Sequence, residues 1–290
     1  MNALHEPHPC SVARLAPARA MFNTVRVVAA FAALVFAAAA VLVSFSATAQ
    51  TLSPAGAAAA PDTIDRIKRS IVAVGTVQRT RSPQFQFMGT GFAVGDGSYI
   101  ATNAHVIPNT LNINERETLA VLLPIPGEVA QWRELQRVAS DPGRDLAVLR
   151  MGGQPLTPLT LRRGGRVRDG ETYLFTGYPI GSILGPFPVT HRGMIASITP
   201  IAIPQGRAGD LDPQTIRRLS VGPIPIFQLD GTAYPGNSGS PLYDPETGEV
   251  VGVINMVFVR GSRESALSQP SGITYAIPVD HLARMVAEIK

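Results

Sequence analysis

Short segments rich in β-branched residues, broken at frequent intervals by Gly, Pro, Asp and Asn, are the feature that most restricts the fold of this chain. Such segments are typical of β-strands joined by tight turns. They form two sets, separated by the Pro- and Gly-containing stretch 154–165. Two sets of similar size predict an all-β protein built from two β-barrels. The expected strands are 70–77, 91–94, 98–101, 119–123 and 146–150 in the first set, and 172–177, 189–197, 227–229, 250–256 and 272–276 in the second.

Helical periodicity is clear only at the end of the chain. After Pro278, apolar residues recur at helical spacing, which predicts an amphipathic helix over 278–290. Upstream of the strands, the Ala-rich stretch 50–61 is expected to be a linker, followed by a short helical turn over 62–68 that Asp62 caps. We expect the two barrels to occupy 62–155 and 156–277.

The first 49 residues have the pattern of a leader and an export signal. Met21 and Arg26 precede an uncharged apolar run over 27–45, and Ala47-Thr48-Ala49 offers a small-residue cleavage site. Cleavage after Ala49 would release a periplasmic or secreted protein. The apolar run is also long enough for an uncleaved anchor facing the periplasm, so contact with a membrane depends on whether the leader is cut. Translation could start at Met1 or at Met21.

Composition argues against several kinds of partner. The basic residues are almost all arginines and are scattered, with no basic run, so we expect no nucleic-acid partner. The only cysteine, Cys10, lies before the apolar run, so the exported chain would contain no disulfide. No cluster of His, Cys and Asp has the spacing of a metal site, and no phosphate-binding loop precedes a helix, so no metal or cofactor is expected.

The segment 235–241, Pro-Gly-Asn-Ser-Gly-Ser-Pro, carries the strongest chemical signal. Glycines at 236 and 239 allow a tight loop that holds the Ser238 hydroxyl toward a cleft. A serine hydroxyl becomes a nucleophile only when a base removes its proton and a third group orients that base. A nucleophilic Ser238 therefore requires a histidine at a strand end and a carboxylate fixed beside a buried strand.

His105 and Asp145 are the residues that fit these requirements. His105 follows a predicted strand, where it can project into a cleft, and Asp145 stands at the mouth of the buried strand 146–150. The other histidines after the leader, His191 and His281, are predicted to be structural. The competing acid, Asp141 in Asp-Pro-Gly, is predicted to form a turn. The order His, Asp, Ser is one of the known orders of a catalytic triad.

Together these segments resemble the trypsin-like (chymotrypsin-fold) serine peptidases, and specifically their HtrA/Deg branch. The likeness extends from about residue 62 to residue 290. It implies an all-β fold of two antiparallel six-stranded barrels with a C-terminal helix. The matching blocks are 89–92 (GTGF), 100–106 (IATNAHV), 145–149 (DLAVL), 177–179 (GYP), 236–239 (GNSG) and 275–279 (YAIPV).

The resemblance also implies roles for individual residues. Ser238 would attack the scissile carbonyl, His105 would act as base and then acid, and Asp145 would hold the imidazole tautomer. Backbone N–H groups of the Gly236-Asn237-Ser238 segment would form the oxyanion hole, those of Gly236 and Ser238 donating. The substrate side chain is expected to be small or medium and apolar. The residues expected to bind it are Ala233, Tyr234, Ile254, Asn255 and Met256.

The implied function is that of an exported serine endopeptidase that hydrolyses polypeptides through an acyl-enzyme and acts in protein quality control. The alternative is a non-catalytic or latent chaperone or scaffold of the same fold. Unlike most HtrA-type proteins, the chain shows no PDZ domain, and its loop over 79–87 is short, so both a monomer and a homotrimer remain open. The long insertion 199–226 is predicted to set activity, a hypothesis that deleting 204–220 would test.

Overall fold

The computed structural model describes residues 55–123, 131–180, 187–200, 224–255 and 272–289. The chain divides into two compact units, Met1–Ser53 and Pro54–Lys290, and every described residue belongs to the second. The predicted export signal, most of the predicted insertion (201–223) and Met256 therefore lie outside the described residues. Within the described part, no helix is both long and apolar enough to span a membrane.

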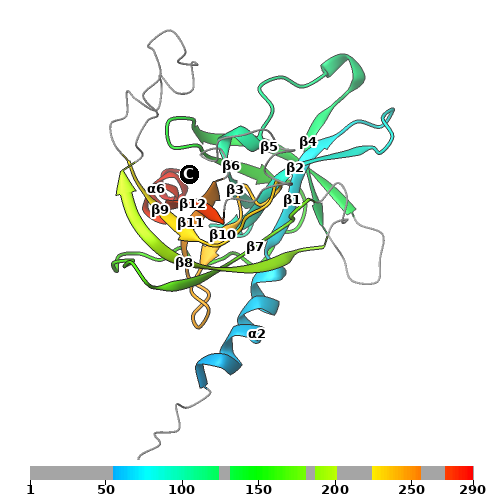
Figure 1. Ribbon diagram of the computed structural model, residues 1–290. Helices are drawn as coiled ribbons and strands as arrows, with labels where there is room; N and C mark the ends of the chain where they lie inside the picture. Colours follow the sequence, from blue (N-terminus) through cyan, green and yellow to red (C-terminus); the bar gives the residue numbers. More distant parts are fainter. Residues whose placement is uncertain (1–54, 124–130, 181–186, 201–223, 256–271, 290) are drawn as a thin grey trace, which may run out of the picture. The chain divides into compact units, whose positions relative to one another are not determined.

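The first barrel consists of six antiparallel strands in the closed order β1-β2-β3-β6-β5-β4 (Figure 1). Pairing of β1 with β4 closes it, with Ala73 opposite Leu122. Because closure leaves no free sheet edge, every strand has two hydrogen-bonded neighbours. The strands are β1 (Ile71–Val77), β2 (Phe85–Val94), β3 (Tyr99–Thr102), β4 (Thr118–Leu123), β5 (Gln131–Asp141) and β6 (Leu146–Met151).

The second barrel has the closed antiparallel order β10-β11-β12-β9-β8-β7. Pairing of β10 with β7 closes it, with Leu242 opposite Phe175. The predicted fold of two antiparallel six-stranded barrels followed by a helix is therefore confirmed. The strands are β7 (Thr172–Gly177), β8 (Val189–Pro200), β9 (Pro225–Asp230), β10 (Pro241–Tyr243), β11 (Val250–Asn255) and β12 (Ile273–Pro278).

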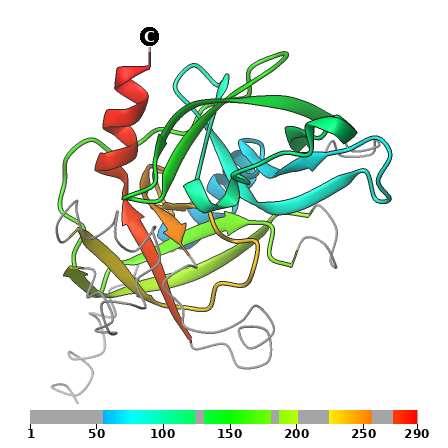
Figure 2. The ribbon, with the colours of Figure 1, turned by 90° about the horizontal axis from the view of Figure 1, so that it is seen from above.

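Two helices flank the barrels. The helix α6 (Val279–Glu288) follows β12 directly, as predicted, and contacts both β11 and β6 (Figure 2). The helix α2 (Ala55–Lys68) corrects the expected linker, because it covers 14 residues rather than one short turn. Its Arg66 donates to the carbonyl oxygen of Thr247 at 2.7 Å, so its last turns are tied to the turn between β10 and β11.

The apolar core explains how the two barrels are held together. Strand β1 is buried along its whole length, and its residues alternate between two clusters. Val72 and Val74 face the interior of the first barrel, whereas Ile71 joins a cluster that also contains Tyr178 and Tyr243 of the second barrel. The same alternation occurs in β6, as expected for strands whose successive side chains point to opposite faces. Both barrels therefore share one core cluster.

Candidate functional site

The turn that carries His105 packs against the start of β6, where Asp145 lies. Nδ1 of His105 is 2.6 Å from Oδ2 of Asp145, and the backbone N–H of His105 donates to Oδ1 at 2.9 Å. The carboxylate of Asp145 is buried, while the His105 side chain is partly exposed. The structure thus brings together the predicted base, in the turn after β3, and the predicted orienting acid, directly before β6.

The backbone around Asp145 is fixed as firmly as its side chain. Asp145 has a φ of 57°, a left-handed conformation that aspartate tolerates better than most residues. Its carbonyl oxygen accepts hydrogen bonds from the backbone N–H of Ala104 at 3.2 Å and from Nδ2 of Asn103 at 3.0 Å. Since both donors directly precede His105, these bonds fix the position of the His105 turn relative to Asp145.

Asn255, predicted to contact substrate, lies against the acid. It is fully buried at the end of β11, and its Nδ2 donates to Oδ2 of Asp145 at 2.7 Å. The carboxylate oxygen that faces the His105 ring therefore has a second donor, contributed by the other barrel. An amide donor at this distance restrains the rotation of the carboxylate.

Ser238 lies in the loop between β9 and β10 and is anchored beside the His105 turn. Its carbonyl oxygen accepts the backbone N–H of Thr90 at 2.9 Å. A Cβ built on the neighbouring Gly89 would lie 3.0 Å from that carbonyl oxygen and 2.7 Å from a methyl of Val106, so only glycine fits between the two segments. Among the described residues, the Ser238 hydroxyl makes no hydrogen bond, so in this state it is not bonded to His105.

In the loop around Ser238, backbone carbonyl groups accept hydrogen bonds, while two backbone N–H groups donate none to the described residues. The carbonyl oxygens of Pro235 and Asn237 accept the N–H groups of Ile180 at 2.7 Å and of Ser240 at 3.0 Å. Within the described residues, the N–H groups that follow them, those of Gly236 and Ser238, donate no hydrogen bond. Because the C=O and N–H of a trans peptide point in opposite directions, holding these carbonyls fixes both N–H groups.

The residues predicted to line the specificity pocket are placed differently from one another. Ala233 is buried and donates its N–H to Oγ1 of Thr274 at 2.9 Å. Tyr234 is partly exposed, and its ring centroid lies 6.0 Å from that of His191. Ile254 belongs to the interior of the second barrel, so its side chain serves the core. The substrate-binding roles of these residues stay predictions.

The competing residues lie in other settings. His191 stacks on Phe175 with ring centroids 5.0 Å apart, and burial lowers the pKa of its imidazole, which favours the neutral ring. Asp141 accepts the backbone N–H of Arg144 at 3.0 Å and pairs with its guanidinium at 2.7 Å. Neither His191 nor Asp141 is bonded to His105, Asp145 or Ser238 in the described structure. Their surroundings agree with the structural roles expected for them.

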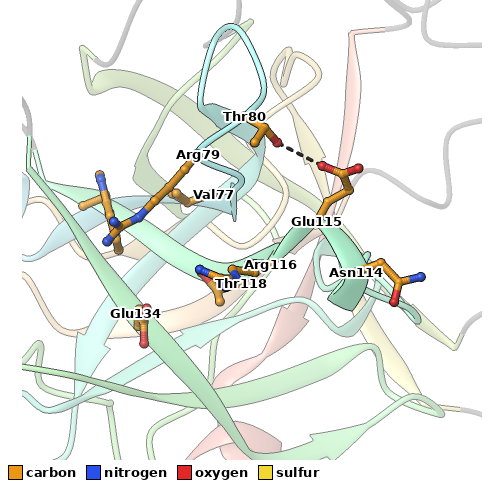
Figure 3. Close-up of a pocket in the computed structure, with 9 residues that line it drawn as sticks. Val77, Arg79, Thr80, Asn114, Glu115, Arg116, Thr118 and Glu134 are labelled. Carbon is orange, nitrogen blue, oxygen red and sulfur yellow. Dashed lines mark hydrogen bonds between the residues drawn. The ribbon is translucent and has the colours of Figure 1, made fainter.

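A separate pocket of about 530 Å³ lies on the first barrel (Figure 3). At one end of it, Oγ1 of Thr80 donates to Oε2 of Glu115 at 3.1 Å. No residue predicted to be catalytic or to bind substrate lines this pocket, so it is distinct from the candidate site. Its lining residues are Val77, Arg79, Thr80, Asn114, Glu115, Arg116, Thr118, Trp132 and Glu134.

Comparison with known proteins defines the class to which this fold and site belong. The model of the family described as "Trypsin-like peptidase domain" matches residues 89–253, a range that includes His105, Asp145 and Ser238. The chain belongs to the trypsin-like peptidase family. A protein from Hahella chejuensis named "Probable periplasmic serine endoprotease DegP-like" is 29% identical over 219 residues, which are 74% of this chain and 38% of that protein.

Further relatives agree with the resemblance to the HtrA/Deg branch, which is thereby confirmed. A protein of the same name from Pseudomonas putida is 29% identical over 211 residues, or 70% of this chain and 36% of its own length. The chain thus spans little more than a third of the curated relatives it matches.

Two solved structures share the fold. The active form of the Rv3671c protease from M. tuberculosis has a TM-score of 0.58 at 21% identity, covering 80% of this chain and 86% of its own. Deg5 has a TM-score of 0.53 at 24% identity, covering 77% of this chain and 90% of its own.

Proposed function

We propose that this chain is a serine endopeptidase in which Ser238 is the nucleophile, His105 the general base and Asp145 the orienting acid. The observation that carries the proposal is the contact of the buried Asp145 carboxylate with both the ring and the backbone of His105. Family membership and the anchoring of Ser238 beside the His105 turn support it further.

The contact geometry also indicates which tautomer His105 adopts. An ionised carboxylate can only accept hydrogen bonds, so the proton between the two groups belongs to Nδ1 of His105. In the neutral ring, Nε2 is then left as an acceptor, which is the state a general base requires. His105 would take the Ser238 proton as its oxygen attacks the peptide carbonyl, and would return it to the leaving amine, forming an acyl-enzyme that water hydrolyses.

The unused N–H groups of Gly236 and Ser238 would form the oxyanion hole. Removing one such donor in a serine peptidase costs about 2.7–4 kcal/mol of barrier, so fixed donors would be a substantial part of the catalysis. Asn237 would contribute through the backbone, because its carbonyl accepts from Ser240 and so orients the N–H of Ser238.

The names of the relatives support a location and a substrate class. Their names include "periplasmic serine endoprotease", and the leader pattern over 1–49 agrees with export, so we assign this chain to the periplasm with polypeptides as substrates. Partly exposed Tyr234 next to buried Ala233 favours an apolar substrate side chain. The proposed role in protein quality control is what the resemblance to the HtrA/Deg branch implies.

Digestion of a mixture of unfolded polypeptides tests the proposal. The wild-type chain should generate new amino termini with one preferred residue type before the cut, whereas Ser238→Ala should generate none. Equal cleavage by both proteins would indicate a contaminating peptidase. If the wild-type chain binds the unfolded polypeptides but does not cleave them, the chaperone or scaffold alternative would be favoured.

A further inference from the structure

Thr90, on β2 of the first barrel, forms hydrogen bonds with three parts of the second barrel's site. It is fully buried, and its Oγ1 donates to the carbonyl oxygen of Gly236 at 2.7 Å while accepting the backbone N–H of Tyr178 at 3.0 Å. Its own backbone N–H donates to the carbonyl oxygen of Ser238 at 2.9 Å. Oγ1 of Thr102 donates to the Thr90 carbonyl at 2.7 Å, which fixes Thr90 itself.

The Thr90 hydroxyl contacts a glycine of the Ser238 loop whose backbone can change conformation. Gly236 has a φ of +103°, and without a Cβ it has wide access to other backbone conformations. Two contacts define its conformation: the N–H of Ile180 holds the peptide before Gly236, and the Thr90 hydroxyl holds the peptide after it. The Gly236 N–H belongs to the peptide that Ile180 holds, because C=O and N–H of one peptide share a plane. The Thr90 contact holds the following peptide, so it restrains rotation at Gly236 that would let the N–H turn away.

We propose that Thr90 is a positioning residue for the oxyanion hole, whose hydroxyl holds the Gly236–Asn237 peptide and so restrains the backbone at Gly236 that directs the Gly236 N–H toward the oxyanion. This inference rests on the proposed serine-peptidase function. Thr90 does not touch the substrate, and its effect passes through Gly236. Because the hole acts on the tetrahedral state rather than on bound substrate, losing the hydroxyl should lower kcat and leave KM nearly unchanged.

Two substitutions separate the hydroxyl from the rest of the side chain. Thr90→Ser keeps the hydroxyl and loses only the methyl group. Thr90→Val keeps the shape but sets a methyl between the Gly236 carbonyl and the Tyr178 N–H, so both polar groups lose their partner. Thr90→Ala also removes the hydroxyl and cannot overpack the site, so it replaces Thr90→Val if that variant does not fold.

The experiment measures kcat, KM and the affinity for a peptide boronic acid, which mimics the tetrahedral state, using the full-length chain. We expect Thr90→Val to lower kcat about 10- to 100-fold, less than or comparable to losing a direct oxyanion donor, with KM changed less than about 3-fold. Boronate affinity should fall by a similar factor, whereas the affinity for a cleaved peptide product should not. Thr90→Ser should stay within about 3-fold of wild type in every measurement.

Thr76→Val is the matched control. Thr76 is a buried threonine on β1 whose hydroxyl donates to Glu117 at 2.6 Å, and it has no hydrogen bond to the Ser238 loop. It should lose stability and keep kcat. The proposal is overturned if Thr90→Val keeps the kcat of Thr90→Ser, or if Thr76→Val loses as much kcat as Thr90→Val. A wild-type chain that cleaves no peptide and binds no boronate refutes the proposed function and this role with it.

Discussion

Replacing Asn255 by alanine removes the donor that the second barrel supplies to the buried Asp145 carboxylate. The lost hydrogen bond is 2.7 Å long and joins two buried residues. Hydrogen bonds to charged groups contribute about 1.5–3 kcal/mol to stability, and a buried acceptor that loses its donor retains its desolvation cost. We therefore expect the free energy of unfolding of Asn255→Ala to fall by about 1.5–3 kcal/mol at neutral pH.

The same substitution should also slow the reaction. Oδ2 of Asp145 faces Nδ1 of His105 at 2.6 Å, and Asn255 restrains the rotation of that carboxylate. A loss of about 1.4 kcal/mol in orienting the imidazole corresponds to a 10-fold fall in kcat. Urea unfolding followed by circular dichroism measures the stability, and hydrolysis of a peptide substrate measures kcat.

Asn103→Ala is the matched control for Asn255→Ala. Asn103 is equally buried, and its Nδ2 donates at 3.0 Å to the carbonyl oxygen of Asp145, a neutral acceptor on the same residue. A neutral hydrogen bond contributes about 0.5–1.5 kcal/mol, so this variant should lose less stability. The reasoning is refuted if Asn255→Ala is no less stable than Asn103→Ala and retains the wild-type kcat.

Three further substitutions test other parts of the structure. Gly236→Ala should lower kcat and reduce the free energy of unfolding by about 1–2 kcal/mol, because φ is +103° and the new Cβ would overlap the Tyr178 carbonyl. Urea unfolding measures the loss of stability. A variant that is as active and as stable as wild type would contradict this. Ser240→Ala should keep or raise the melting temperature, because the Ser240 hydroxyl is buried without a hydrogen-bond partner among the described residues. A clear fall in the melting temperature would contradict this. Hydrogen bonds from the Asn112 backbone and the Thr76 hydroxyl lower the pKa of Glu117 in the folded protein. The ionised Glu117 therefore stabilises the fold above the unfolded pKa of about 4.3, and this contribution is lost as pH falls through the folded pKa. The stability difference between wild type and Glu117→Gln should therefore shrink on acidification; a difference that persists at low pH would refute it.

Most of the strands that the sequence predicted have buried apolar residues, although β8 exposes Val189 and Met194. β1 is buried on both faces, and β7 was predicted with its observed bounds, Thr172–Gly177. Two strands were missed for opposite reasons. β5 (Gln131–Asp141) is mostly exposed and carries many polar residues, so it lacks a strand pattern, whereas β10 (Pro241–Tyr243) has only three residues and begins with proline.

The contact between His105 and Asp145 could be anticipated, because a strand-end histidine and an acid at the start of a buried strand each have recognisable local settings. The part played by Asn255 could not. Its position at the end of β11 predicts proximity to the site, but only the packing of one barrel on the other decides whether its side chain faces substrate or Asp145. The role of Thr90 could not be predicted from the sequence for the same reason, because the partners of its hydroxyl, Gly236 and Tyr178, lie more than eighty residues away along the chain.

The most direct test of the central claim is to treat the chain with an organophosphonate probe and to locate the adduct by mass spectrometry. We predict one adduct per chain, on Ser238, that His105→Ala slows strongly and that Ser238→Ala abolishes. An adduct on another residue, or none on a folded wild-type chain, would contradict the assignment of Ser238, His105 and Asp145 to a single reactive site.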